Sequence, residues 1–389
     1  MKLGEIQEAL RDQQVDGWLF FDHHERDPLA YRILKIAPGR AVTRRWYYMI
    51  PAEGEPRGLV HRIEAGMLES LPGSKRTYGS WREQVAGLAQ LLAGMRRVAM
   101  QYSPECALPQ VSLADAGTVE LVRKLGVEIV SSADLVQRFE ARWSAANLAH
   151  HLEAGRRVDR IRAEAFRLIG TRLGEGLPVS ECLVRDFIRE RFQAEGLVSD
   201  HGPIVAVNEN ASKPHYEPRP GCDRQLKRGD VVLIDLWAKL DEPEGVYYDV
   251  TWVGYCGVQA PEKLREVFNV VREARDRAIE LVRARVRQGV EIRGYEVDDA
   301  ARDYISGRGY GEYFTHRTGH SIGKDVHGAG ANMDNLETHD DRRILPWTCF
   351  SVEPGIYLPE FGVRSEVNIF VGDGDVQVTG EMQTEIVQI

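Results

Sequence analysis

Five side chains of the types that bind metal ions follow one another in the second half of this 389-residue chain, in the order Asp235, Asp249, His320, Glu353 and Glu366. Four carboxylates and one imidazole drawn to one point would repel one another, because buried like charges raise each other's pKa and resist ionisation unless cations neutralise them. Two divalent ions would supply that neutralisation. The order and the local sequence of the five residues therefore predict a two-metal site of the hydrolytic kind.

Asp235 and Asp249 fall on the two strands of a predicted β-hairpin. Asp235 lies inside the apolar run VVLIDLWAKL and Asp249 lies in VYYDVTWVGYCG, and the polar segment DEPEG forms the turn between them. A carboxylate in such a run is costly to bury unless it is paired or bound to a metal. Taken alone, each aspartate leaves an ordinary alternative open, such as a turn cap or an ion pair with Lys239.

Glu353 and Glu366 repeat this arrangement on a second predicted hairpin, SVEPGIYLPEFGVRSEVNI, where each glutamate stands in a strand. The alternative is that Glu353 bonds only Arg364 and that Glu366 faces the solvent. Two hairpins that each present two carboxylates favour the metal site over that alternative.

The histidines occur in the glycine-rich segment HRTGHSIGKDVH. His316 and His320 have the i, i+4 spacing of a zinc-binding helix, but Arg317 stands where the catalytic glutamate of that motif belongs. Gly319 within the segment disfavours a continuous helix. We therefore expect His316, His320 and His327 to lie on strands or loops that line a cleft.

Residues 1–141 are predicted to form a separate α/β domain. Helical stretches such as IQEALRDQQVDG and GLAQLLAGM alternate there with the β-rich runs WLFF, RWYYMIP, GLVH and RRVAMQ. A long amphipathic helix follows, with apolar residues at helical spacing that include Leu148, Leu152 and Val158. We place the domain boundary just before this helix.

The second domain, residues 142–389, is predicted to be α+β. A helix, VSECLVRDFIRERFQAEG, precedes the first hairpin, and another begins after Pro261 and ends near Gly289. The rest of the chain is rich in strand-forming runs and in glycine.

Composition excludes several classes of function. The chain has 50 basic and 59 acidic residues and a net charge of -9, which argues against a nucleic-acid-binding protein. The first residues lack an apolar run, so we expect neither a secretory signal nor a membrane span. We expect a cytoplasmic location. The five cysteines are scattered and form no CxxC pair, which is typical of reduced thiols.

The strings YYDVT, HRTGHSIGKDVH, VEPGIY and GVRSE, with the order Asp, Asp, His, Glu, Glu, resemble the pita-bread dinuclear metallopeptidases. The resemblance covers about residues 145–389 and favours the proline-directed branch, which contains Xaa-Pro dipeptidase (prolidase) and aminopeptidase P. The N-terminal half is similar to the creatinase-type domain of that branch. The resemblance implies hydrolysis of the bond between an N-terminal residue and proline in short peptides, and a homodimer formed through the N-terminal domains.

The resemblance also implies a role for each site residue. Asp235, Asp249 and Glu366 would bind one metal or both, and His320 and Glu353 would complete the pair. Mn²⁺ is expected, with Co²⁺ or Zn²⁺ as alternatives. The ions would hold a bridging hydroxide that attacks the peptide carbon, and Glu353 would carry the proton.

Further residues are expected to face the substrate. His215, in PIVAVNENASKPHYEP, and His327 resemble two substrate-facing histidines, and His316 resembles a third, outer one. His327 or His215 would stabilise the oxyanion, and Arg364 would hold a carboxylate of the substrate or of a neighbouring side chain.

The chain departs from the family pattern at four positions near these residues. Trp237 and Trp347 stand in place of usual glycines, and Gly328 and Val367 stand in place of usual acids. All five ligand types are nevertheless present, so the departures bear on the substrate more than on the metals. Trp237 would narrow or reshape the cleft beside Asp235.

Two alternatives of other classes stay open. One is a metal-independent amidinohydrolase of the same fold, and the other is a non-catalytic binding module. Retention of all five ligand types argues against both. The cluster DHHERD at residues 22–27 is expected to be a solvated loop rather than a metal site.

Overall fold

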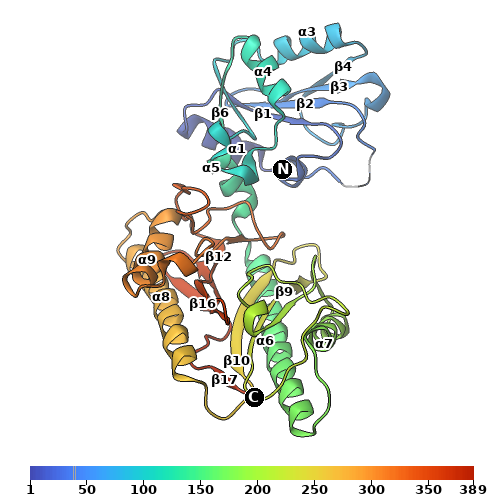
Figure 1. Cartoon of the computed structure of the whole chain (residues 1–389). Coiled ribbons are helices and arrows are strands. Elements are labelled where there is room, and N and C mark those ends of the chain that lie inside the picture. The colour runs from blue at the N-terminus through green and yellow to red at the C-terminus, as the bar shows by residue number, and fades with distance from the viewer. Residues whose placement is uncertain (38, 40) are drawn as a thin grey trace. The chain divides into compact units, whose positions relative to one another are not determined.

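The computed structural model describes residues 1–37, 39 and 41–389 and divides into two compact units, Met1–Glu140 and Ala141–Ile389. Each unit has its own sheets and its own buried core, and Figure 1 shows the elements of both. The five cysteines are free, which confirms the expectation of reduced thiols.

The N-terminal unit is built on one six-stranded sheet in the order β4-β3-β2-β1-β5-β6. β2 runs antiparallel to its neighbours and the other strands run parallel to one another. The strands are β1 (Gly17–Asp22), β2 (Trp46–Pro51), β3 (Arg57–His61), β4 (Ser74–Tyr78), β5 (Arg97–Met100) and β6 (Glu128–Ser131). The helices are α1 (Leu3–Asp12), α2 (Pro28–Leu34), α3 (Trp81–Leu91), α4 (Ala116–Lys124) and α5 (Ala133–Val136).

Four helices enclose the strands of the C-terminal unit, with α6 and α7 on one side and α8 and α9 on the other (Figure 1). They are α6 (Ala145–Gly174), α7 (Glu181–Ala194), α8 (Glu262–Arg287) and α9 (Gly294–Gly307). Ser144 caps α6 by accepting the N–H of Asn147, whose side chain accepts the N–H of Ser144 in return. The predicted helices at α6, α7 and α8 are confirmed.

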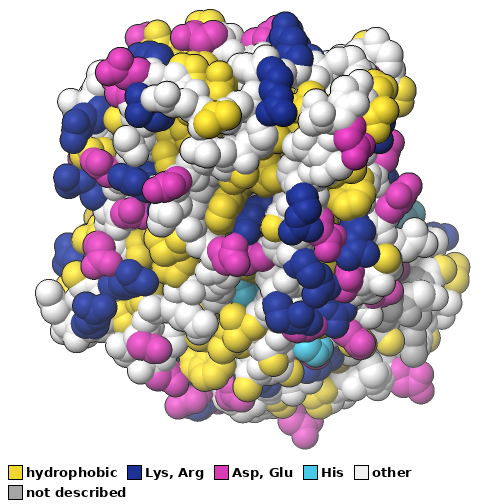
Figure 2. All heavy atoms as spheres, turned by 90° about the horizontal axis from the view of Figure 1, so that it is seen from below, with side chains coloured by type: hydrophobic (Ala, Val, Ile, Leu, Met, Phe, Trp, Pro, Cys, Tyr) yellow, Lys and Arg dark blue, Asp and Glu magenta, His cyan; other side chains and the backbone are white. Residues whose placement is uncertain are grey.

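One face of the molecule is of mixed charge. On the face shown in Figure 2, basic and acidic side chains are interspersed around a hollow that contains apolar side chains. This mixture differs from the single-sign stripe of a nucleic-acid-binding face. Of the helices that the structure describes, none is long and apolar enough to cross a bilayer.

The strands of the C-terminal unit form three sheets. A five-stranded sheet contains β7 (Leu197–Val198), β8 (Ile204–Val207), β9 (Val231–Leu240), β10 (Tyr248–Tyr255) and β17 (Val387–Gln388). A four-stranded sheet contains β11 (Ser321–Ile322), β12 (Thr348–Val352), β15 (Val367–Val371) and β16 (Val376–Thr379). The short pair β13 (Gly355–Tyr357) and β14 (Gly362–Arg364) forms the third.

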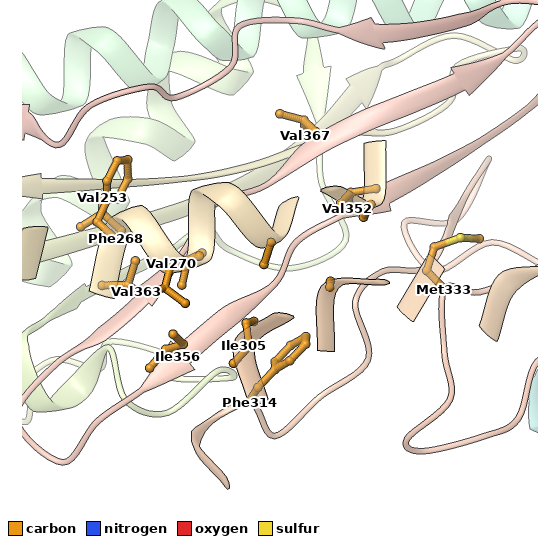
Figure 3. Packing of buried hydrophobic residues seen from close by; sticks show 14 of the residues in the cluster. Val253, Phe268, Val270, Ile305, Phe314, Met333, Val352, Ile356, Val363 and Val367 are labelled. Carbon is orange, nitrogen blue, oxygen red and sulfur yellow. The ribbon is translucent and has the colours of Figure 1, made fainter. Parts of the chain in front are cut away.

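The core of this unit packs α8 and α9 against the strands, as Figure 3 shows for part of the cluster. Val352 and Val367 lie directly opposite each other on β12 and β15 and are 0% and 1% exposed. Glu353 follows Val352 and Glu366 precedes Val367, so the two glutamates adjoin the buried ends of these strands. The core therefore positions two of the predicted ligands.

The structure corrects three expectations. Glu353 and Glu366 do not stand within strands: Glu353 follows β12 and Glu366 precedes β15, while the hairpin between them is the short β13–β14 pair. Helix α9 lies in a region that we expected to be rich in strands. Leu152 is 38% exposed, although its spacing on α6 predicted an apolar contact.

Candidate metal centre

The first two predicted ligands share one face of the β9–β10 hairpin. Asp249 is directly opposite Trp237, and Asp235 is directly opposite Thr251. Residues that pair across antiparallel strands point to the same face, so the two carboxylates project together. Asp235 and Asp249 are 6% and 5% exposed, which confirms a buried pair of carboxylates on this hairpin.

Asp249, His320 and Glu366 come together as a group that is able to hold a metal ion. One ligand atom from each lies within 4.8 Å of the other two. His320 Nε2 is 3.6 Å from Asp249 Oδ2 and 3.3 Å from Glu353 Oε1, so Glu353 borders the same group.

Two buried carboxylate oxygens fit the binding of a cation. Asp249 Oδ1 and Glu366 Oε1 have no hydrogen-bond partner among the residues that the structure describes. A buried oxygen without a partner is costly, and a metal ion would satisfy it. The donor set of carboxylates and one imidazole is of the kind that binds hard or borderline divalent ions. The residues present therefore fit the metals that the sequence predicts.

Like charge and burial perturb the carboxylates of this group. Burial, followed by the neighbouring Asp235 and Glu353, raises the pKa of Asp249 well above its usual range. Burial, followed by Asp249 and Glu353, does the same for the pKa of Glu366. Burial also raises the pKa of Glu353 to about 7, against the opposing effect of Arg364. The cluster thus needs either protons or cations to be stable.

Arg364 is bound within the site by all three of its nitrogens. Its Nη2 donates to Asp235, its Nη1 donates to the Tyr357 hydroxyl at 3.1 Å and its Nε donates to Thr251 Oγ1 at 3.0 Å. Asp235 is therefore paired with Arg364 and not with Lys239, whose Nζ donates to the carbonyl of Lys324. The sequence analysis expected Arg364 to hold a carboxylate either of the substrate or of a neighbouring side chain. In the structure it holds the carboxylate of Asp235.

The predicted histidines are placed differently from one another. The rings of His320 and His327 lie edge to face with centroids 4.3 Å apart. The ring of His316 is engaged on both sides, with Nδ1 2.7 Å from the carbonyl oxygen of Arg317 and Nε2 2.7 Å from the Tyr357 hydroxyl. These contacts make His316 a support for Tyr357.

His215 is exposed, and His327 lies in ring contact with His320. The His327 pKa is lowered to about 4, first by removal from water and then by Arg317 and by His215, which lies near it. The imidazole of His327 is therefore neutral at pH 7 and offers one N–H donor.

Three supporting residues escaped the sequence analysis, and each is two positions from a ligand. Thr251 Oγ1 donates to Glu366 Oε2 at 2.7 Å, and Ser351 Oγ donates to Glu353 Oε1 at 3.1 Å. Asn368 accepts the N–H of Asp249 at 3.0 Å and donates to its carbonyl. The sequence signal that could have identified them is a polar residue two positions from a ligand, since alternate residues of an extended chain share a face.

The structure describes the surroundings of three of the four departures from the expected pattern. Trp237 lies on the face of the metal ligands, and its indole N–H donates to Asp200 Oδ1 at 2.9 Å. Trp347 has a backbone φ of 65°, a conformation that favours glycine, so the usual glycine at this position has a steric reason. Val367 is part of the core, which an acid at this position would disrupt.

Comparisons with known proteins assign the family. The sequence profile of metallopeptidase family M24 matches residues 149–373. The probable dipeptidase PepE of Mycobacterium bovis is 28% identical over 359 residues, which cover 90% of this chain and 87% of that protein. The Xaa-Pro dipeptidase of Lactobacillus helveticus is 38% identical over 164 residues, which cover 42% of this chain and 40% of that protein.

The fold is shared with solved structures of the same family. The crystal structure of dipeptidase PepE from Mycobacterium ulcerans superposes with a TM-score of 0.75 over 100% of this chain and 96% of that chain, at 23% sequence identity. With its pita-bread fold and its buried cluster of carboxylates and histidine, the chain belongs to metallopeptidase family M24.

Proposed function

We propose that this metallopeptidase hydrolyses the peptide bond between an N-terminal residue and proline, with two divalent ions bound by Asp235, Asp249, His320, Glu353 and Glu366. The observation that carries the metal part of the proposal is the convergence of Asp249, His320 and Glu366 beside Glu353. The similarity to the Lactobacillus helveticus Xaa-Pro dipeptidase supports the preference for proline. Mn²⁺ is the ion that we expect in the cell.

Divalent ions in such a site activate a water molecule and polarise the scissile carbonyl. Glu353 is the proton carrier. As a general base that becomes a general acid, its carboxylate would accept a proton from the attacking water and return it to the leaving nitrogen. Ser351 Oγ donates to Glu353 Oε1 at 3.1 Å, which orients the other oxygen for the transfer.

The remaining residues position the reacting groups. Neutral His327, with His215 beside it, donates a hydrogen bond to the oxyanion that forms from the scissile carbonyl. Arg364 and Tyr357 orient Asp235, and His316 in turn orients the Tyr357 hydroxyl. A role of His316 in direct contact with the substrate is not part of this proposal.

The test is cleavage of a peptide panel by the purified protein loaded with Mn²⁺, followed by mass spectrometry. The panel contains Xaa-Pro dipeptides, longer Xaa-Pro-Xaa peptides and Xaa-Ala controls. Cleavage of the dipeptides alone makes the protein a prolidase, and cleavage of the longer peptides makes it an aminopeptidase of the P type. Cleavage of the Xaa-Ala controls alone would contradict the preference for proline. Absence of any metal-dependent cleavage would contradict the proposed reaction and favour the amidinohydrolase or binding alternatives.

The expectations of a homodimer and of a cytoplasmic location belong to the same proposal. Analytical ultracentrifugation tests the first, and fractionation of the source cells tests the second. A monomer at micromolar concentration would contradict the dimer without affecting the reaction.

A further inference from the structure

A pocket of about 630 Å³ opens at one edge of the sheet in the N-terminal unit. Its volume is within the range of small-molecule sites, which is roughly 300–1,000 Å³. The lining includes Phe21 and His23 at the end of β1, His61 at the end of β3 and Tyr78 at the end of β4. In open α/β sheets, ligands bind outside the carboxyl ends of parallel strands, near the point where the strand order reverses. Here the order reverses at β1, because β2 to β4 lie on one side of it and β5 and β6 on the other.

Positive charge dominates this pocket. Three arginines line it, Arg26, Arg44 and Arg45, and Asp115 is the one acid among the described lining residues. Both oxygens of Asp115 are already used at 2.9 Å, where they accept the N–H and the hydroxyl of Thr118. The charge of Asp115 is therefore committed to the start of α4.

Two of the arginines have no acidic partner. No carboxylate within the described part of the chain forms an ion pair with Arg26 or Arg45. The Arg44 guanidinium donates to the carbonyl oxygen and the hydroxyl of the adjacent Thr43, and the Arg44 backbone N–H donates to Glu64 Oε2 at 3.2 Å. Burial, followed by His24 and Arg26, lowers the pKa of His23, with a further contribution from Arg45. The chain as a whole has a net charge of -9, so an excess of basic side chains in one pocket is a local feature that the composition does not predict.

Two helices begin at the same edge of the sheet. Helix α3 starts after Ser80 and helix α4 starts after Asp115, and Ser80, Gly117 and Thr118 all line the pocket. The N-terminus of a helix carries a partial positive charge and favours a bound anion. At Gly117 the atom near an added Cβ would be Asp115 Oδ1 at 3.3 Å, so the capping carboxylate already occupies the first turn of α4 and the anion has to be bound by the arginines.

The rest of the wall is aromatic. Phe21, Tyr78 and Trp81 line the pocket, and the ring of His61 meets that of Tyr78 edge to face at 5.0 Å. Trp81 is 63% exposed. The Arg82 guanidinium lies over one face of this ring, 4.5 Å from its centroid, and a planar ring stacked on the other face would remove apolar surface from water.

We propose that this pocket binds a small organic anion in which a phosphate or carboxylate is joined to a planar ring, of the size of a mononucleotide. The oxyanion lies against Arg26, Arg44 and Arg45, and the ring lies against Trp81 and Tyr78. Guanidinium groups suit this role because their planar fork matches the oxygens of a phosphate or carboxylate. The proposal does not depend on the peptidase reaction.

The experiment is isothermal titration of the full-length protein with AMP, adenosine, inorganic phosphate and benzoate. We expect AMP to bind more tightly than either adenosine or phosphate, because it engages both the arginines and the aromatic wall. Comparison of AMP with benzoate identifies which oxyanion the arginines prefer. In a variant with Arg26→Gln and Arg45→Gln, we expect affinity for AMP to fall at least about tenfold, since hydrogen bonds to charged groups contribute roughly 1.5–3 kcal/mol each.

The matched control is a variant with Arg96→Gln and Arg97→Gln. It removes the same charge from the same unit, but at the start of β5, at the opposite edge of the sheet. Binding that the control retains and the Arg26/Arg45 variant loses supports the site, provided that thermal unfolding shows both variants to be folded. Equal losses in the two variants, equal affinity for adenosine and AMP, or no binding of any probe by the unaltered protein would each overturn the proposal.

Discussion

Glu353 is the residue at which the proposed chemistry can be separated from the fold. Glu353→Gln keeps the size of the side chain and removes its ability to carry a proton, so we expect kcat for Xaa-Pro cleavage to fall by roughly 10²–10⁴-fold. Steady-state kinetics measure this loss, and circular dichroism checks the fold. The matched control is Glu360→Gln, an exposed glutamate close in sequence, between β13 and β14, which should leave kcat unchanged. Full activity of Glu353→Gln would exclude its role as proton carrier.

Thr251 offers a second test at the residue scale, because its hydroxyl joins a metal ligand to Arg364. Thr251→Val removes the 2.7 Å hydrogen bond to Glu366 and the acceptor for Arg364 Nε. Loss of such a supporting contact typically lowers metal affinity or activity by roughly 10–100-fold. Titration of Mn²⁺ into metal-free protein measures the effect. Thr251→Ser keeps the hydroxyl and should restore most of the affinity, whereas equal affinities of the two variants would refute the role of the hydrogen bond.

Three of the five residues that the sequence predicted as ligands, Asp249, His320 and Glu366, come together in the structure, whereas most of the residues that support them were not predicted. A carboxylate within an apolar strand, as at Asp235, is conspicuous because it is costly without a partner. Arg364 as the partner of Asp235 was not predictable, since 129 positions separate them and the pairing depends on how two hairpins are brought together. The pairing of Trp237 with Asp200 was hidden for the same reason.

At the scale of elements, the close packing of α6 against β10 is required for the position of Asp249. A Cβ added at Gly155 would lie 2.7 Å from two ring atoms of Tyr248, which is 1% exposed and precedes Asp249. We expect Gly155→Ala to destabilise the protein by about 1–3 kcal/mol through overpacking. Gly174→Ala at the end of the same helix meets no atom within 4 Å and should be neutral or slightly stabilising. Urea unfolding of both variants measures their free energies of unfolding. A Gly155→Ala variant as stable as the unaltered protein would contradict the close contact between Gly155 and Tyr248.

His151 links three elements and makes stability depend on pH. It lies on α6, its Nδ1 is 2.7 Å from the carbonyl oxygen of Tyr247, and its Nε2 is 2.7 Å from Thr379 Oγ1 on β16. Burial lowers its pKa to about 4 from an unfolded value of 6.5. The unfolded chain therefore binds more protons between these values, and the free energy of unfolding falls as the pH falls from 6.5 to 4, by at most about 3 kcal/mol.

The His151→Gln variant isolates this contribution. We expect its stability to vary less than that of the unaltered protein between pH 6.5 and 4, because the residue that takes up the proton on unfolding is gone. Urea unfolding at a series of pH values measures the difference. Parallel stability curves for the two proteins would show that His151 does not titrate on unfolding.

Strong periodicity explains which elements were predictable. The α6 and α8 sequences have long apolar stripes, and the β9 and β10 sequences flank a polar turn, so all four follow from local patterns. Helix α9 was missed because it begins at Gly294 and its N-cap, Arg293, is not one of the usual capping residues. Its apolar residues Val297, Ala301 and Ile305 pack into the cluster that includes α8, so tertiary contacts compensate for a weak local signal.

For the whole molecule, the division into two units predicts which part of the chain metal binding stabilises. All proposed ligands lie between residues 235 and 366, inside the unit Ala141–Ile389. Ligand binding stabilises the native state by RT ln(1 + [L]/Kd), about 2.7 kcal/mol at 100 times Kd. We expect Mn²⁺ to slow hydrogen exchange in β9, β10, β12 and β15 and to leave β1 to β6 unchanged.

Hydrogen exchange followed by mass spectrometry, with and without Mn²⁺, makes this measurement on the full chain. The control is Glu366→Ala, which removes one ligand and should abolish most of the protection. Protection spread evenly over both units, or protection that Glu366→Ala retains, would contradict binding at the proposed site.

The two hydrogen bonds between the Asn368 side chain and the Asp249 backbone bear on how the protein folds during synthesis. These residues are 119 positions apart, so Asp235 and Asp249 leave the ribosome long before Glu366 and Asn368 do. Contacts between distant segments form late, after the loop between them has closed. Tight metal binding therefore has to wait until β12 and β15 are in place. It follows that the ion binds tightly to chains that have completed this part of the fold, and that it acts late in folding.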